Sequence, residues 1–244
     1  DRQVDLAAHH FDGQSDPEFQ AELDKRLQSL AEGTASSRQE AADRVRSRFA
    51  DYLFAQSELH KYPEEGFDVI LAVDDLIPAF VRRWEAFLSR LDAASDPIFS
   101  AWFQFAGLPT NDFSQHAEQV TKQLVNPTSA TTTHPWITQL FPSAPSDLRQ
   151  VAKQYGELFA RVNDKWKQLQ ATQPEKWFEE DHAWTAKAGP LLDGLYGATA
   201  PCEVPDEEII ATETFFDSGT CNELWRLQGE VDRWRLQAPR APSV

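Results

Sequence analysis

Residues 148–169 read LRQVAKQYGELFARVNDKWKQL, and this stretch decides the fold class of the chain. Apolar side chains recur along it every three or four residues, which is the repeat of an amphipathic α-helix with a near-heptad rhythm. Ser146 lies just before the stretch and is expected to cap the helix. The apolar positions are Leu148, Val151, Ala152, Tyr155, Leu158, Phe159, Val162, Trp166 and Leu169.

The same repeat extends through most of the 244 residues. Near the amino end, Ser15 offers a cap, Pro17 lies in the first turn, and this helix is expected to end near Gly33. A second helix is expected from Ser36 or Ser37. Further helical stripes cover residues 76–91, 96–106 and 218–236.

The fold class predicted from these stripes is all-α, an irregular multi-helix bundle with at most a short strand pair. The apolar run at residues 67–73 is where a short strand would form. Residues 126–145 are rich in Thr, Ser and Pro, and they are predicted to be a surface connection. The expected organisation is an N-terminal helical part (1–125) and a C-terminal helical part (146–244), packed as one domain.

The charge and hydropathy of the chain exclude some partners. Its formal charge of −16 repels phosphate backbones, so we expect no nucleic acid partner. No run of about 18 apolar residues is present, so we expect no membrane insertion. A start at Asp1 in a chain without Met is typical of a trimmed segment of a longer protein.

No catalytic or metal motif is found in the sequence, so this segment alone is not expected to be an enzyme or to bind a metal. His9 and His10 are adjacent, and neighbouring side chains on a regular element point in different directions. The acidic runs at 64–65, 179–181 and 206–208 could supply a carboxylate pair for glycoside hydrolysis. They also adjoin prolines or helix starts, where acidic residues favour the helix dipole.

Eight tryptophans are the main candidates for ligand binding. Three of them, Trp84, Trp166 and Trp234, lie on apolar helical stripes and are expected in the core. Trp136, Trp177 and Trp184 lie in less regular sequence, and they could stack on sugar rings if exposed.

Cys202 and Cys221 are 19 positions apart, which is neither a zinc spacing nor a Cys-x-x-Cys redox pair. A disulfide between them and two separate buried thiols both remain open from the residues alone.

Five segments of the sequence are distinctive: residues 68–88 (DVILAVDDLIPAFVRRWEAFL), 96–103 (DPIFSAWF), 201–208 (PCEVPDEE), 215–217 (FFD) and 224–234 (LWRLQGEVDRW). Together they resemble large planctomycete surface proteins of the cytochrome c type, in the variable middle region between two domains of unknown function. The family's Cys-x-x-Cys-His haem signature is absent here, so any haem c would lie elsewhere in the parent chain.

The resemblance implies an extracytoplasmic location, either periplasmic or at the cell surface, and export favours the Cys202–Cys221 disulfide. It also implies roles in polysaccharide breakdown or surface electron transfer. The leading hypothesis is a non-catalytic helical module that spaces or docks the flanking domains. The alternatives are a glycan-binding part of a carbohydrate-active oxidoreductase or hydrolase, and an acidic electron-transfer partner surface.

Overall fold

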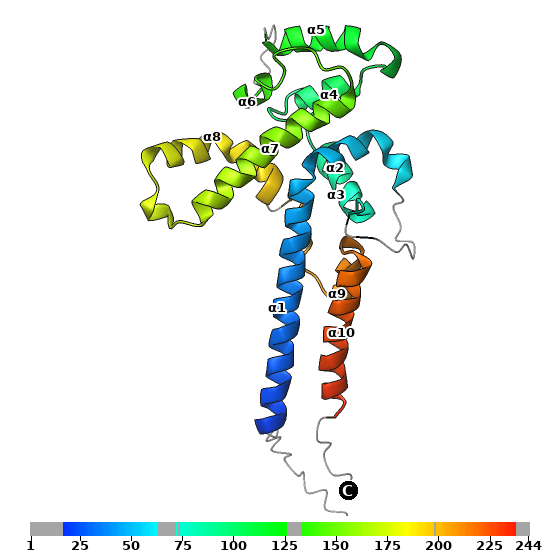
Figure 1. Ribbon diagram of the computed structural model, residues 1–244, viewed down its shortest axis with the longest axis vertical. Helices are drawn as coiled ribbons and strands as arrows, with labels where there is room; N and C mark the ends of the chain where they lie inside the picture. The colour runs from blue at the N-terminus through cyan, green and yellow to red at the C-terminus, as the bar shows by residue number, and fades with distance from the viewer. Residues whose placement is uncertain (1–16, 63–71, 73, 126–132, 198, 238–244) are drawn as a thin grey trace, which may run out of the picture.

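The computed structural model describes residues 17–62, 72, 74–125, 133–197 and 199–237. Within these ranges the chain forms ten α-helices and four short 3-10 helices, with no strand (Figure 1). The predicted all-α class is confirmed. The strand considered for residues 67–73 lies outside the described residues, apart from Ala72. None of the described helices is both long and apolar enough to span a bilayer.

Figure 1 shows a long two-helix projection below a cluster of shorter helices. We call residues 17–40 of α1 together with α10 the stalk, and we call helices α2 to α8 the head. The helices are α1 (Pro17–Ser47), α2 (Phe49–Ala55), η1 (Gln56–Lys61), α3 (Pro78–Ser89), α4 (Ser100–Ala106), η2 (Thr110–Asp112), α5 (Phe113–Val125), α6 (Pro135–Thr138), α7 (Leu148–Gln170), η3 (Pro174–Lys176), α8 (Glu179–Tyr196), α9 (Ile209–Thr212), η4 (Glu213–Phe215) and α10 (Ser218–Arg235).

Helix α7 runs through the centre of the head, at the place predicted from its apolar stripe. It packs closely on α2, where the rings of Phe49 and Phe159 stack with centroids 3.9 Å apart. Its cap is Asp147 rather than the predicted Ser146, because the Asp147 carboxylate accepts a hydrogen bond from the Gln150 amide at 2.8 Å.

Gly156 allows the close approach of α7 to α2. A Cβ atom at this position would lie 2.7 Å from the Cβ of Ala50 and 3.2 Å from its backbone nitrogen. Backbone atoms of a packed helix cannot move aside as the tip of a long side chain can. The absence of a side chain at Gly156 therefore sets the distance between the two helices.

The buried apolar residues form a cluster that includes side chains from α1 to α10. Part of the predicted surface connection belongs to it, because Ile137 and Phe141 are fully buried. Because residues 126–145 are rich in Thr and Pro, the sequence did not predict that Ile137 and Phe141 are buried. Residues 126–132 of that stretch lie outside the described ranges.

Helix α1 continues through Gly33, so the predicted helix end at that glycine is wrong. A Cβ atom at Gly33 would lie 2.7 Å from Cδ1 of Leu227 in α10. The glycine thus lies in the contact between α10 and α1. It acts in helix packing and does not terminate the helix.

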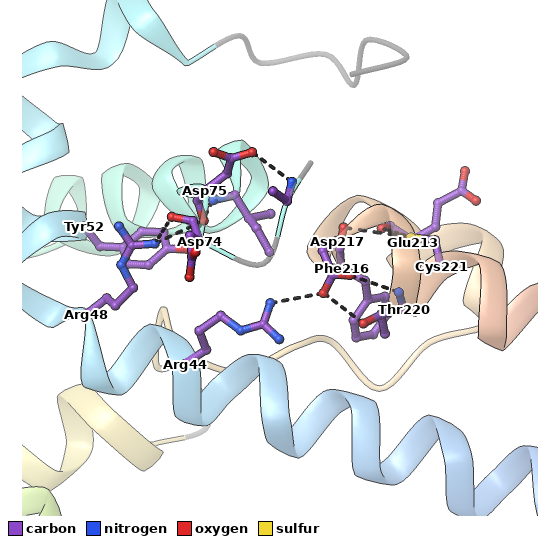
Figure 2. Close-up of polar contacts among 12 residues, drawn as sticks. Arg44, Arg48, Tyr52, Asp74, Asp75, Glu213, Phe216, Asp217, Thr220 and Cys221 are labelled. Carbon is purple, nitrogen blue, oxygen red and sulfur yellow. Dashed lines mark hydrogen bonds and ion pairs between the residues drawn. The ribbon is translucent and has the colours of Figure 1, made fainter. Parts of the chain in front are cut away.

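At the end of the stalk that lies nearest the head, an ion pair joins Arg44 of α1 to Asp217, the capping residue of α10 (Figure 2). Arg44 Nη1 lies 3.1 Å from Asp217 Oδ2, and the same carboxylate accepts hydrogen bonds from the Thr220 amide and hydroxyl. Burial alone raises the pKa of Asp217. The Thr220 hydrogen bonds and the Arg44 charge outweigh it and lower the pKa below its usual value.

A second polar contact lies beside this joint in Figure 2. The Arg48 side chain donates to the carbonyl oxygens of Asp74 and Asp75, and the Tyr52 hydroxyl accepts a hydrogen bond from the Ile77 amide at 3.2 Å. These bonds hold the segment that leads into α3 against α2. The two contacts fix both α3 and α10 to the same region of α1 and α2.

Arg46 is the most deeply buried charge of this region, with only 2% of its surface exposed. Its Nε donates to the Leu195 carbonyl oxygen at 3.1 Å, and its other nitrogens pair with Asp43 and Glu203. Its guanidinium also lies 4.1 Å from the ring centroid of Tyr196. Arg46 therefore links α1, α8 and the connection that follows α8.

Candidate functional site

The candidate site is built on His134, which caps the short helix α6. His134 Nδ1 accepts a hydrogen bond from the Trp136 amide at 3.2 Å, so this nitrogen carries no proton. Its Nε2 then donates to the Lys187 carbonyl oxygen on α8, 3.0 Å away. The imidazole therefore fixes the start of α6 against α8.

This arrangement brings two of the three tryptophans predicted for ligand binding into one pocket. The rings of Trp136 and Trp184 have centroids 6.2 Å apart and are tilted by 35°. The pocket has a volume of about 330 Å³, and both indoles are half-buried. Its lining residues are Trp136, Gln139, Leu140, Leu158, Arg161, Val162 and Trp184, and we call this pocket the tryptophan cleft.

The tryptophan cleft combines apolar walls with a few polar groups. Leu158 and Val162 of α7 line its apolar part, while Gln139 and Arg161 are exposed and supply donors. The Lys187 ammonium lies 5.2 Å from the Trp136 ring centroid, on the side of α8. Apolar walls with few polar groups are typical of a small-molecule site, and the volume is at the lower end of that class.

Trp177 lies apart from this cleft and has a structural role. Its Nε1 donates to the Leu169 carbonyl oxygen and to the Thr172 hydroxyl, both at 3.1 Å. Its ring packs against Trp166 at a centroid distance of 6.1 Å. These contacts close the carboxyl end of α7.

The three tryptophans predicted for the core differ in burial. Trp84 is fully buried, whereas Trp166 and Trp234 are half-buried against neighbouring aromatic rings. Trp234 stacks on Phe19 at 5.4 Å and donates to the Phe19 carbonyl oxygen at 3.1 Å. It therefore holds the far end of the stalk together and is not part of the head.

Both cysteines are free thiols, so the predicted disulfide is not formed in this structure. Cys202 is buried in the core, and burial raises the pKa of its thiol to about 12. Cys221 lies in the first turn of α10, where its thiol donates to the Glu213 carbonyl oxygen at 3.1 Å. Burial raises the pKa of this thiol too, so neither sulfur is activated as a nucleophile.

One side chain of each acidic cluster in the described ranges has a structural partner. Residues 179–181 form the first turn of α8, where Asp181 accepts from the Phe178 amide and pairs with Lys165 at 2.8 Å. Asp206 pairs with Arg38 of α1. No group of three or more metal-binding side chains occurs among the described residues, and residues 9–12 and 64–65 lie outside them.

Arg161 and Gln139 were not singled out from the sequence, although one signal for Arg161 was present. It lies three residues after Leu158 and one before Val162, on the edge of the apolar stripe of α7. An arginine at such an edge borders both the core and solvent. No local pattern points to Gln139 or Lys187, because their position beside the tryptophan cleft depends on how α6 packs against α8.

Comparisons with known proteins do not identify a family or a function for this chain. Neither the protein-family models nor the curated proteins nor the solved structures provided a match to the chain. The resemblance to planctomycete cytochrome-type surface proteins therefore stays a prediction.

Proposed function

We propose that this chain is a non-catalytic helical module that spaces or docks the flanking domains of a larger extracytoplasmic protein. The observation that carries the proposal is the stalk. Helix α1 has 31 residues, and at 1.5 Å per residue it is about 46 Å long. The amino end of α1 and the carboxyl end of α10 lie side by side at the pole opposite the head (Figure 1).

Contacts along the whole stalk support a stiff spacer. The Phe19–Trp234 stack closes the far end, and Arg26 lies 5.0 Å from the Trp234 ring centroid. The Gly33–Leu227 approach lies in the middle, and the Arg44–Asp217 ion pair lies at the head. These contacts define one antiparallel register, which resists sliding of the two helices.

Spin labels would test whether the stalk is stiff. Lys25 on the stalk and Glu118 on α5 are both exposed and suit cysteine substitution. The background would carry Cys202→Ala and Cys221→Ser, so that only the new thiols react. We expect pulsed electron paramagnetic resonance to give one narrow distance distribution, because the stalk contacts hold α1 against α10 and Arg46 holds α1 against α8 of the head.

A matched variant controls this experiment. Trp234→Ala removes the stack on Phe19 and should broaden the distribution, whereas Trp225→Ala removes an exposed tryptophan from the same helix and should not. A broad distribution in the unmodified stalk would count against a spacer, because the helices would then move independently of the head.

The tryptophan cleft supports a second function, the binding of a glycan. The negative face of an indole attracts the C–H groups on the apolar face of a sugar ring. Trp136 and Trp184 offer two such faces in one pocket, and Gln139 and Arg161 offer donors for hydroxyl groups. We infer a neutral or acidic saccharide of one or two rings, given the volume of about 330 Å³.

A glycan array followed by titration calorimetry tests this second function. A dissociation constant on the order of 0.1 mM, about −5.5 kcal/mol, is expected for a pocket of this kind. Trp184→Ala should weaken binding at least tenfold, or about 1.4 kcal/mol, through lost stacking. Arg161→Gln is a second variant at an exposed position, chosen in case Trp184→Ala does not fold.

Trp225→Ala serves as the control for the glycan experiment, because Trp225 is 40% exposed and belongs to α10. Binding that falls equally in Trp184→Ala and Trp225→Ala would refute the cleft as the site. Absence of binding to every glycan would leave the spacer as the function of the module. Glycan binding that depends on Trp184 would favour the second function over a purely structural one.

A further inference from the structure

A second pocket lies between α3 and the connection that follows α8, and its chemistry differs from that of the tryptophan cleft. It has a volume of about 530 Å³ and is lined by Arg83, Ala86, Ser89, Arg90 and Thr199. Two arginines and two hydroxyl side chains thus face one space, and none of these lining residues is acidic. This is unusual in a chain of net charge −16.

Neither arginine has an ion-pair partner among the described residues. Arg83 donates to the Ala200 carbonyl oxygen at 3.3 Å and lies 5.7 Å from the Phe215 ring centroid. Its Nε is buried and has no hydrogen-bond acceptor in the described part of the chain. Arg90 uses its Nε to contact the Ala86 carbonyl oxygen, which leaves its terminal nitrogens for another acceptor.

The positive charges of Arg83 and Arg90 repel each other. Burial and the nearby charge of Arg90 lower the pKa of Arg83, although Glu203 acts in the opposite direction. The carboxylate of Glu203 is already paired with Arg46. An anion placed between the two guanidinium groups would relieve this repulsion and supply the missing acceptors.

We propose that this pocket binds a small molecule that carries a tetrahedral oxyanion, either a phosphate or a sulfate group. Arg83 and Arg90 would contact the oxyanion, and Thr199 would donate from its hydroxyl group. The Ser89 hydroxyl also lines the pocket, but its proton is donated to the Ala86 carbonyl oxygen at 3.1 Å. The pocket is larger than one such ion, so the remaining volume accommodates the organic part of the ligand. This site is independent of both functions proposed above, because it shares no residue with the tryptophan cleft or the stalk contacts.

Titration calorimetry at constant ionic strength tests the site with four probes: inorganic phosphate, inorganic sulfate, glucose 6-phosphate and glucose 6-sulfate. We expect the two sugar esters to bind more tightly than the free ions, with dissociation constants on the order of 1 mM or below. Unmodified glucose should show no binding that depends on Arg90, because any glucose bound in the tryptophan cleft does not contact this pocket. The difference between phosphate and sulfate esters identifies which oxyanion the pocket prefers.

Arg90→Gln is the first variant, because Arg90 is exposed and its loss should not prevent folding. It should weaken binding of the sugar esters at least tenfold, and Arg83→Gln should do the same. Arg233→Gln is the matched control, since it removes the same charge from an exposed position on α10. Its dissociation constants should stay within twofold of those of the unmodified protein.

Three results would overturn the proposal. The first is that none of the four probes binds, and the second is that Arg233→Gln weakens binding as much as Arg90→Gln does. The third is that Arg90→Gln lowers the melting temperature without changing ester affinity, because Arg90 would then serve only to stabilise the carboxyl end of α3.

Discussion

Replacing Gly156 with valine is expected to destabilise the fold by about 3 kcal/mol, the upper part of the usual range for overpacking. The new side chain would enter the contact between α7 and α2, where the nearest atoms include the backbone nitrogen and Cα of Ala50. Gly156→Ala should cost about 1 kcal/mol, because the better helix propensity of alanine offsets part of the steric cost. Urea unfolding at 25 °C measures both values.

Gly229→Val is the matched control for this series. Gly229 also lies inside a helix, but a Cβ atom there would have no neighbour within 4 Å. The substitution should therefore change the free energy of unfolding by no more than about 0.5 kcal/mol. Equal effects at the two glycines would mean that the close contact between α2 and α7 does not determine the cost.

Replacing Arg46 with alanine is expected to destabilise the fold by about 3 kcal/mol, the low end for breaking a buried ion pair. Alanine would leave the Leu195 carbonyl oxygen without its donor and would remove the guanidinium from the Tyr196 ring. The cost stays at the low end because Asp43 and Glu203 reach solvent and can be hydrated.

Arg46→Lys separates charge from geometry at this position. Lysine keeps the positive charge but cannot donate in several directions from one planar group, so it should recover only part of the lost stability. Arg233→Ala should have an effect within about 0.5 kcal/mol, as expected for an exposed position. If Arg46→Ala unfolds at the same urea concentration as the unmodified chain, the Arg46 contacts contribute nothing to stability.

The sequence was sufficient to predict the fold class and most helices, because the buried face of a helix is visible in the local spacing of its apolar residues. The stripe of α7 and the extent of α10 are both confirmed. The error at Gly33 has a different origin. A glycine that ends a helix and a glycine that admits a neighbouring helix look identical until the partner, here Leu227, is known.

The candidate sites were less predictable, since each depends on contacts between distant segments. Trp136 and Trp184 were identified as candidates, but no local pattern predicts that His134 joins α6 to α8 and so brings the two indoles together. Arg83 and Arg90 lie within the helical stripe predicted for residues 76–91, but the stripe does not predict a pocket. The pocket depends on Thr199 and Ala200, which lie against α3 although they are more than 100 residues away in the sequence.

The order of the stalk helices along the chain has a consequence for folding during synthesis. The Trp234 indole and the Phe19 carbonyl oxygen that accepts from it are 215 residues apart, so α1 leaves the ribosome long before α10 exists. Pairing across such a separation carries a loop-closure cost that local helices do not have. The first turns of α1 therefore remain without their partner while the head assembles, and the stalk is completed only when α10 has left the ribosome.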